Sequence, residues 1–196
     1  MQYYADYYPP AAETFGQRYA DASFRDLLLD EKNSTKISDW IKKDTNFLIY
    51  TGNPGIGKTY FCAAFYNFLK DTKRMKTFRY WNERQLLTKL REAIDTDHEY
   101  LQVLSLCIDD HYVLLDDLGS SGVNEWRKEV MFEFLDQRYA SQLPTIITSN
   151  FTEEEIKINY GSRFHSRMFE KGTTIISSKN HDLRAPEKPP ESKTVD

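Results

Sequence analysis

A glycine-rich run, residues 52–59, carries the clearest chemical pattern in this chain: Gly-Asn-Pro-Gly-Ile-Gly-Lys-Thr. It matches the pattern of a phosphate-binding loop in full, between an apolar run and a helical stretch, as that loop requires. Glycines let the backbone curl so that its N–H groups face phosphates. Lys58 would neutralise the β- and γ-phosphates, and the Thr59 hydroxyl would ligate Mg²⁺. We therefore expect a nucleotide to be bound by Gly52, Asn53, Pro54, Gly55, Ile56, Gly57, Lys58, Thr59 and Tyr60.

An acidic pair follows a second apolar run, residues 112–115, in the sequence Tyr-Val-Leu-Leu-Asp-Asp-Leu-Gly. A strand that ends in carboxylates places them at its tip, beside the phosphate loop. We expect Asp116 to hold Mg²⁺ through water and Asp117 to orient the water that attacks the γ-phosphate. The alternative is that the two acids cap the helix that follows.

Polar residues end a third apolar run, residues 145–150, Thr-Ile-Ile-Thr-Ser-Asn. In a strand parallel to the first, Asn150 would lie near the γ-phosphate, where its amide could sense ATP or position water. Farther along, Arg163 and Arg167 are four residues apart, on one face of a helix. Arginines so spaced usually form a solvated face. Downstream of three nucleotide-binding elements, they become candidates for a finger that completes a neighbouring subunit's site.

The elements that must position these residues alternate between strand and helix. This alternation is typical of an α/β domain with a parallel sheet and crossover helices. The apolar patterns predict strands over residues 47–50, 77–81, 112–115, 145–148 and 173–177. They predict helices over residues 21–30, 38–43, 59–69, 83–94, 99–106, 125–139 and 159–169.

Composition sets further limits on the class of protein. A formal net charge of −4 excludes a strongly basic nucleic-acid module but allows a local basic patch. No stretch has the length and apolarity of a membrane helix, and we find no secretory signal pattern at the N-terminus. The two cysteines, Cys62 and Cys107, fit neither a disulfide framework nor a zinc site, so we expect a cytoplasmic protein.

Three segments are expected along the chain. Residues 1–20 form an arm that is rich in tyrosine near its start and then contains Pro9-Pro10. This arm either offers an aromatic strip to a partner or a base, or packs on its own domain. Residues 21–184 form the nucleotide-binding domain. Residues 185–196 contain three prolines and form a disordered tail.

Beyond these motifs, the chain resembles the AAA+ ATPases, and within them the DnaC/IstB-type helicase loaders. Besides the phosphate loop, the resemblance is carried by residues 18–24, Tyr80-Trp81 with 86–91, 114–119, and Arg138-Tyr139 with 143–150. It covers roughly residues 18–184. It implies a P-loop three-layer sandwich around a five-stranded parallel sheet, with a small or absent C-terminal lid. It also implies ATP and Mg²⁺ as cofactors.

The resemblance also assigns roles to single residues. Asn150 matches the family's sensor 1 position, Arg163 its arginine finger, and Arg167 the second arginine of that box. Arg184, in His-Asp-Leu-Arg, matches the late arginine that acts as sensor 2. Residues 18–24 match the segment that contributes to the adenine pocket.

A loader of this group implies three partners. They are a replicative hexameric helicase of the DnaB type, single-stranded DNA, and further copies of the chain that assemble through the ATP sites. The DNA would follow basic and aromatic residues between the second and third strands: Lys76, Arg79, Tyr80, Trp81, Arg84, Lys89 and Arg91. An ordinary helix with a charged outer face explains these residues equally well.

One departure keeps other functions open. DnaC-type loaders carry a sizeable helicase-binding domain before the ATPase, whereas here only the arm precedes the matching region. The main alternative is an IstB-type transposition ATPase that acts with a transposase on duplex DNA. A small-molecule P-loop kinase and an adaptor that binds ATP without hydrolysing it are two further alternatives.

Overall fold

The computed structural model describes residues 8–27, 29–44, 46–94 and 97–178. These residues form a five-stranded parallel sheet with the strand order β2-β3-β4-β1-β5. The strands are β1 (Phe47–Gly52), β2 (Phe78–Asn82), β3 (Tyr112–Leu118), β4 (Thr145–Ser149) and β5 (Thr174–Ser178). The predicted α/β fold with five parallel strands is therefore confirmed. The prediction of a small or absent C-terminal lid stays a prediction, because residues 179–196 lie outside the described part of the chain.

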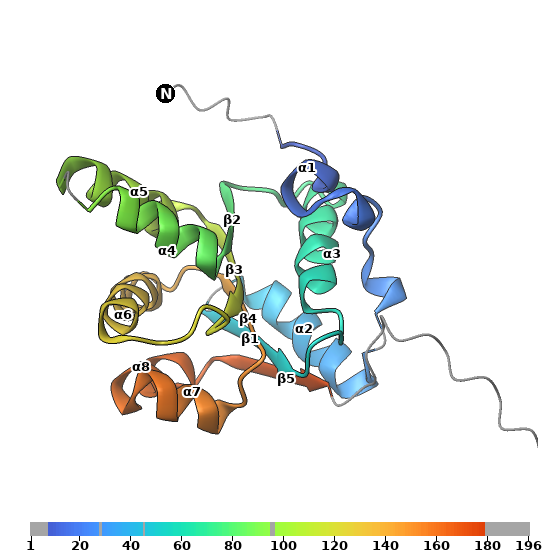
Figure 1. Ribbon diagram of the computed structural model, residues 1–196. Coiled ribbons are helices and arrows are strands. Elements are labelled where there is room, and N and C mark those ends of the chain that lie inside the picture. The colour runs from blue at the N-terminus through green and yellow to red at the C-terminus, as the bar shows by residue number, and fades with distance from the viewer. Residues whose placement is uncertain (1–7, 28, 45, 95–96, 179–196) are drawn as a thin grey trace, which may run out of the picture.

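Helices cover both faces of the sheet (Figure 1). One face carries α1 (Ala11–Phe15), α2 (Glu31–Lys43) and α3 (Lys58–Asp71), together with the 3-10 turns η1 (Gln17–Tyr19) and η2 (Phe24–Asp26). The other face carries α4 (Glu83–Glu92), α5 (Asp97–Asp109), α6 (Glu125–Ala140), α7 (Glu153–Tyr160) and α8 (Ser162–Met168). Among the described residues, we find no helix with the length and apolarity to cross a membrane.

Alternate residues of each strand point to opposite faces, which decides where polar side chains emerge. In β1, Leu48 and Tyr50 pack toward α3, while Phe47 and Ile49 pack toward α6 and α8. All four are at most 1% exposed, as expected for a parallel sheet covered on both sides. The same alternation sends residue 116 of β3 to the face where α3 begins.

Three predicted helices differ from the structure. Among the described residues of 21–30, the turn η2 forms and no α-helix does. The helix predicted over 38–43 is the end of α2, which already begins at Glu31 because the Asp30 side chain accepts a hydrogen bond from the Asn33 backbone N–H at 2.7 Å. The helix predicted over 159–169 is two helices, since Gly161 adopts a φ of 90° between α7 and α8. The first of them begins earlier, at a capping box formed by Thr152 and Glu155.

The described part of the predicted arm, residues 8–20, packs on its own domain. The Tyr66 hydroxyl donates to the Pro9 carbonyl at 2.6 Å, and Phe15 lies against the rings of Tyr66 and Tyr80. For these residues the second of our two alternatives holds. Residues 1–7, with three of the arm's tyrosines, and the predicted tail at 185–196 lie outside the described residues. The predicted boundaries at residues 20 and 184 stay predictions.

Arg138 of α6 holds the amino ends of β3 and β4 together. Its side chain is fully buried and donates to the Thr145 hydroxyl and to four backbone carbonyls. These carbonyls belong to Ile108, Asp110, His111 and Pro144, at 2.7–3.0 Å. A guanidinium supplies five N–H donors in a fixed plane, so this one side chain can donate to several carbonyls at once.

We predict that Arg138→Met lowers the free energy of unfolding by about 3 kcal/mol or more, because it removes the network of hydrogen bonds that a fully buried side chain donates to the amino ends of β3 and β4. Urea unfolding followed by circular dichroism measures this change. Lys128→Met is the control on the same helix, where loss of a surface ion pair with Glu125 changes stability by about 0.5 kcal/mol or less. Equal effects of the two substitutions would contradict the role of Arg138.

Candidate nucleotide-binding site

The phosphate loop joins the end of β1 to the start of α3. Gly55 and Gly57 both have a φ of 90°, a conformation that residues with a Cβ rarely adopt. A loop of this conformation, directly before the N-terminus of α3, can present backbone N–H groups to an anion. The Lys58 ammonium lies over the loop and donates to the carbonyls of Gly52 and Asn53, both at 2.8 Å. The loop therefore has the shape and charge that a triphosphate requires.

Asp116 lies beside the start of α3 and accepts hydrogen bonds from three hydroxyl groups. Thr59 and Tyr80 donate to its Oδ2 at 2.9 and 3.0 Å, and Thr148 donates to its Oδ1. Burial and the nearby Asp116 raise the pKa of Tyr80, which keeps that phenol protonated and a donor. Oxygen donors are the ligands that Mg²⁺ prefers, so Thr59 and Asp116 fit the predicted metal site.

Asp117 is held apart from Asp116 by an unusual backbone conformation. Its φ is 68°, and β3 shifts register with β4 between Leu115 and Leu118. The backbone N–H of Asp117 donates to the Thr148 hydroxyl at 2.9 Å. The side-chain amide of Asn150 donates to Oδ1 of Asp117 at 3.1 Å. Burial, and then repulsion from Asp116, raise the pKa of the Asp117 carboxyl. A carboxylate of raised pKa is better suited to accept a proton from water.

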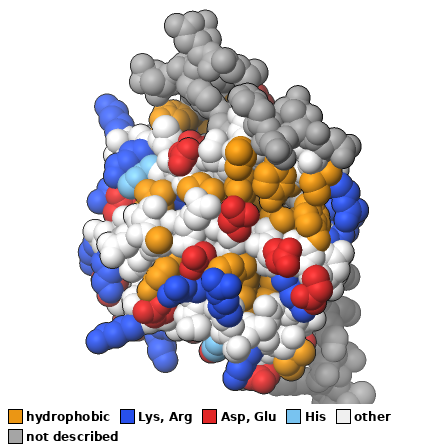
Figure 2. Space-filling view, turned by 90° about the vertical axis from the view of Figure 1, so that its left-hand side faces the viewer, with side chains coloured by type: hydrophobic (Ala, Val, Ile, Leu, Met, Phe, Trp, Pro, Cys, Tyr) orange, Lys and Arg blue, Asp and Glu red, His pale blue; other side chains and the backbone are white. Residues whose placement is uncertain are grey.

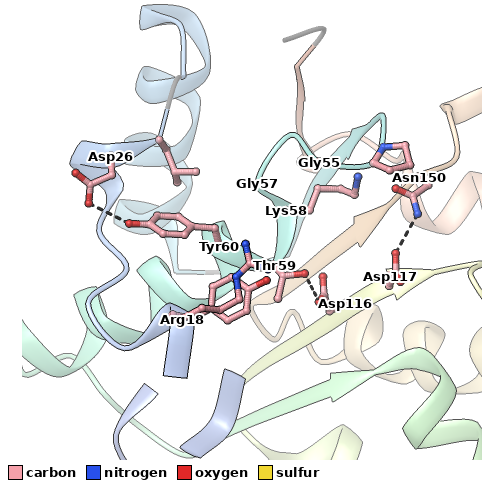
Figure 3. Close-up of a pocket in the computed structure, with 13 residues that line it drawn as sticks. Arg18, Asp26, Gly55, Gly57, Lys58, Thr59, Tyr60, Asp116, Asp117 and Asn150 are labelled. Atoms are coloured by element: carbon pink, nitrogen blue, oxygen red, sulfur yellow. Dashed lines mark hydrogen bonds between the residues drawn. The ribbon is translucent and has the colours of Figure 1, made fainter. Parts of the chain in front are cut away.

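The side chains of the acidic pair, of Lys58 and Thr59, and of Asn150 line one cavity of about 400 Å³. Figure 3 shows Lys58, Thr59, Asp116, Asp117 and Asn150 at one end of it. Of the other predicted ligands, Pro54, Gly55, Gly57 and Tyr60 also line the cavity. Gly52 and Asn53 instead anchor Lys58, while Ile56 is 3% exposed and its carbonyl accepts the Tyr50 hydroxyl. The acidic end and the phosphate loop are thus brought together as predicted.

The other end of the cavity is formed by Arg18, Tyr19, Asp26 and Leu27. Tyr60 fastens this segment to α3, because its hydroxyl donates to Asp26 Oδ2 at 3.0 Å and accepts from the Ser23 amide at 3.2 Å. The family resemblance predicted that residues 18–24 contribute to an adenine pocket. Of these, Arg18 and Tyr19 line the cavity, while the prediction missed Asp26 and Leu27. No local sequence pattern indicated the contact between Tyr60 and Asp26.

The two predicted arginines of α8 do not line the cavity. The Arg163 guanidinium is exposed and lies 4.1 Å from the centre of the Phe132 ring of α6. The Nε of Arg167 donates at 2.7 Å to Asp136, which also lies on α6. Both arginines therefore pack along α6. The predicted sensor 2 residue, Arg184, lies outside the described residues.

Comparisons with known proteins agree with this geometry. The family model described as "IstB-like ATP binding protein" matches residues 17–169. The chain is similar to the replicative helicase loader DnaI of Bacillus subtilis, with 30% identity over 110 residues. It is also similar to the insertion sequence IS1162 putative ATP-binding protein of Pseudomonas fluorescens, with 30% identity over 140 residues. These matches cover 56% and 67% of this chain, but only 34% and 58% of the two relatives.

Solved structures extend the likeness to the fold. The crystal structure of the DnaC helicase loader superposes with a TM-score of 0.66 at 21% identity. That match covers 82% of this chain and 99% of the loader. The predicted resemblance to DnaC/IstB-type AAA+ proteins is therefore confirmed.

We predict that Lys58→Ala lowers ATP affinity by about a hundredfold or more, because it removes the ammonium that faces the β- and γ-phosphates. Binding of a fluorescent ATP analogue, followed by anisotropy, measures this loss. Lys32→Ala, which changes an exposed lysine of α2, serves as the control and retains full affinity. Normal affinity in the Lys58 variant would reject the assignment of the phosphate loop.

Proposed function

We propose a helicase-loading function for this chain, which belongs to the family of IstB-like ATP-binding proteins. ATP with Mg²⁺ would join copies of the chain into a short spiral that deposits a replicative ring helicase on single-stranded DNA, and hydrolysis would release it. The supporting observation is the cavity that unites Lys58, Thr59, Asp116, Asp117 and Asn150 without an arginine from α8. We propose that the protein performs this role in the cytoplasm.

In the proposed reaction, each side chain has a distinct task. Lys58 and the loop amides bind the phosphates, and Thr59 and Asp116 hold Mg²⁺, which neutralises charge on the β- and γ-phosphates when bound. Asp117 takes a proton from the attacking water. The oxygen of that water bonds to the γ-phosphorus, while the bond between the γ-phosphorus and the β-phosphate oxygen breaks. Asn150, which donates to Asp117, orients this carboxylate and reaches toward the γ-phosphate.

The proposed arginine finger acts between subunits. Arg163 is exposed on α8, and its guanidinium rests on the Phe132 ring. A cation–π contact at an exposed site stabilises by only about 0.5–1 kcal/mol, so it is readily exchanged for a phosphate. Arg167, paired with Asp136, would then hold α8 on α6 while Arg163 reaches the neighbour's γ-phosphate.

We predict that Arg163→Ala binds ATP normally but hydrolyses it at least about a hundredfold more slowly, because the finger supplies transition-state charge. A mixing experiment separates action between subunits from action within one. Lys58→Ala is inactive through its phosphate loop yet carries an intact Arg163. Adding it to Arg163→Ala restores turnover if the finger acts on a neighbour. Mixtures that stay inactive at every protein concentration would reject that mechanism.

The face proposed for single-stranded DNA combines indole rings with cations. Lys89 lies over the Trp81 ring at 5.4 Å, and Arg91 over the Trp126 ring at 5.1 Å. Trp81 is only 8% exposed and belongs to the core, so its ring is not available to a base, whereas the partly buried Trp126 beside Arg91 offers a π-surface and a charge to a strand. Arg79 and Lys76 instead pair with Asp110 and Asp44. Figure 2 shows positive and negative side chains interspersed on this side of the molecule, which favours a narrow contact over a broad basic surface.

A second candidate function is that of a transposition ATPase. The family description and the similarity to the IS1162 protein favour it. Its chemistry at the nucleotide would be the same, so the partner distinguishes the two functions.

We predict that the chain forms a complex with its host's replicative helicase in the presence of a non-hydrolysable ATP analogue and loses it with ADP. Gel filtration with light scattering measures the mass of the complex, and Lys58→Ala is the control that forms none. If no complex forms in either state, while the protein still assembles on duplex DNA with ATP, the transposition function replaces helicase loading.

A further inference from the structure

We propose that Tyr80 is a positioning residue for the magnesium ligand Asp116, and that α1 controls Tyr80 through Phe15. The N-terminal segment would thereby regulate metal binding at the nucleotide site. This inference rests on the Mg²⁺–ATP site proposed above and adds a route by which a distant segment acts on it.

The first step of this route is the hydrogen bond between Tyr80 and Asp116. The hydroxyl of Tyr80 donates at 3.0 Å to Oδ2, the same oxygen that accepts the Thr59 hydroxyl at 2.9 Å. Thr59 must face Mg²⁺ and Thr148 holds the other oxygen, Oδ1. Tyr80 is therefore the donor to Oδ2 that, unlike Thr59, would not also ligate the metal.

The second step is the contact that holds the Tyr80 ring. Tyr80 lies on β2, which is at the edge of the sheet and pairs with β3 alone among the described strands. Its ring centre is 4.4 Å from that of Phe15, the last residue of α1. Phe15 also contacts Tyr66 of α3, with ring centres 5.7 Å apart. The aromatic end of α1 is thus wedged between α3 and the tyrosine that touches the metal ligand.

The third step is the way α1 is fastened. This helix has five residues, too few to be stable alone, so its position depends on contacts with the domain. Tyr66 donates to the Pro9 carbonyl at 2.6 Å, and Lys70 donates to the carbonyls of Tyr8 and Pro9 at 3.3 Å. Ala11 is 3% exposed. Displacing this segment would therefore remove the ring that packs against Tyr80.

The test measures how much Mg²⁺ tightens the binding of a fluorescent ATP analogue, as the ratio of its affinity with Mg²⁺ to its affinity in EDTA. We expect Tyr80→Phe to lower this ratio about three- to tenfold, the value of one hydrogen bond, with affinity in EDTA unchanged. Phe15→Ala should lower the ratio in the same direction. Phe15→Leu, which keeps an apolar side chain, provides a second variant if the alanine variant unfolds.

A double-mutant cycle tests the coupling itself. If Phe15 acts through Tyr80, adding Phe15→Ala to Tyr80→Phe changes the ratio no further. Tyr139→Phe is the matched control, since it removes another tyrosine hydroxyl that donates to a carboxylate, Glu170, away from the cavity. It should leave the ratio at the wild-type value.

Two results would overturn the inference while leaving the nucleotide site intact. Either Tyr80→Phe keeps the wild-type ratio, or Phe15→Ala lowers the ratio equally in the presence and absence of the Tyr80 hydroxyl. Failure of the proposed function is distinguishable, because wild-type protein itself would then bind the analogue no more tightly with Mg²⁺. That result would reject both the metal site and its regulation.

Discussion

The burial of one carboxylate, Asp116, constrains the whole nucleotide site. Its side chain belongs to a residue only 3% exposed, and an unpaired charge in such a place is strongly unfavourable. Three hydroxyls offset that cost, and each comes from a different element: Thr59 from α3, Tyr80 from β2 and Thr148 from β4. The carboxylate is satisfied only when these elements have their observed register. The contacts that assemble the sheet edge therefore also aim the proposed metal ligand.

The backbone of β3 becomes irregular directly after Asp116, so that Asp117 faces the cavity while the strand continues to Leu118. Asp117 and Gly119 both adopt positive φ, and a Cβ at Gly119 would lie 2.3 Å from the Phe151 ring. Glu83 of α4 supports this turn. Its buried carboxylate accepts a hydrogen bond from the Tyr160 hydroxyl at 2.8 Å and from the backbone N–H groups of Gly119 and Ser121. Burial raises the pKa of Glu83. Because Tyr160 belongs to α7, the turn after the acids is linked to the pair of helices that carries Arg163.

The features that could be predicted from the sequence are those that short runs of consecutive residues encode. The phosphate loop, the apolar strands and the acids at their tips needed only local patterns, since parallel strands bring their carboxyl ends to one edge. Contacts between residues far apart left no such signal: Tyr60 with Asp26, Tyr80 with Asp116, and Arg138 with the carbonyls before β3. The helices predicted over 21–30, 38–43 and 159–169 were wrong for a local reason, because capping by Asp30 and the break at Gly161 outweighed apolar spacing. The proposed roles of the site residues stay predictions.

The separation of Arg163 from the cavity gives the proposed cycle two independent controls. Within one chain, α8 packs on α6, so nucleotide and Mg²⁺ can bind before any finger arrives. A site that holds its substrate but lacks the cation for the transition state turns over slowly until a second copy docks. In the proposed cycle hydrolysis would report assembly, whereas the contact from Phe15 to Tyr80 would act earlier, on metal binding. A partner that displaces α1 would change how much nucleotide is bound with metal, and a partner that aligns subunits would change how fast it is hydrolysed. A loader needs these two steps to be separable, because it must hold its cargo before it releases it.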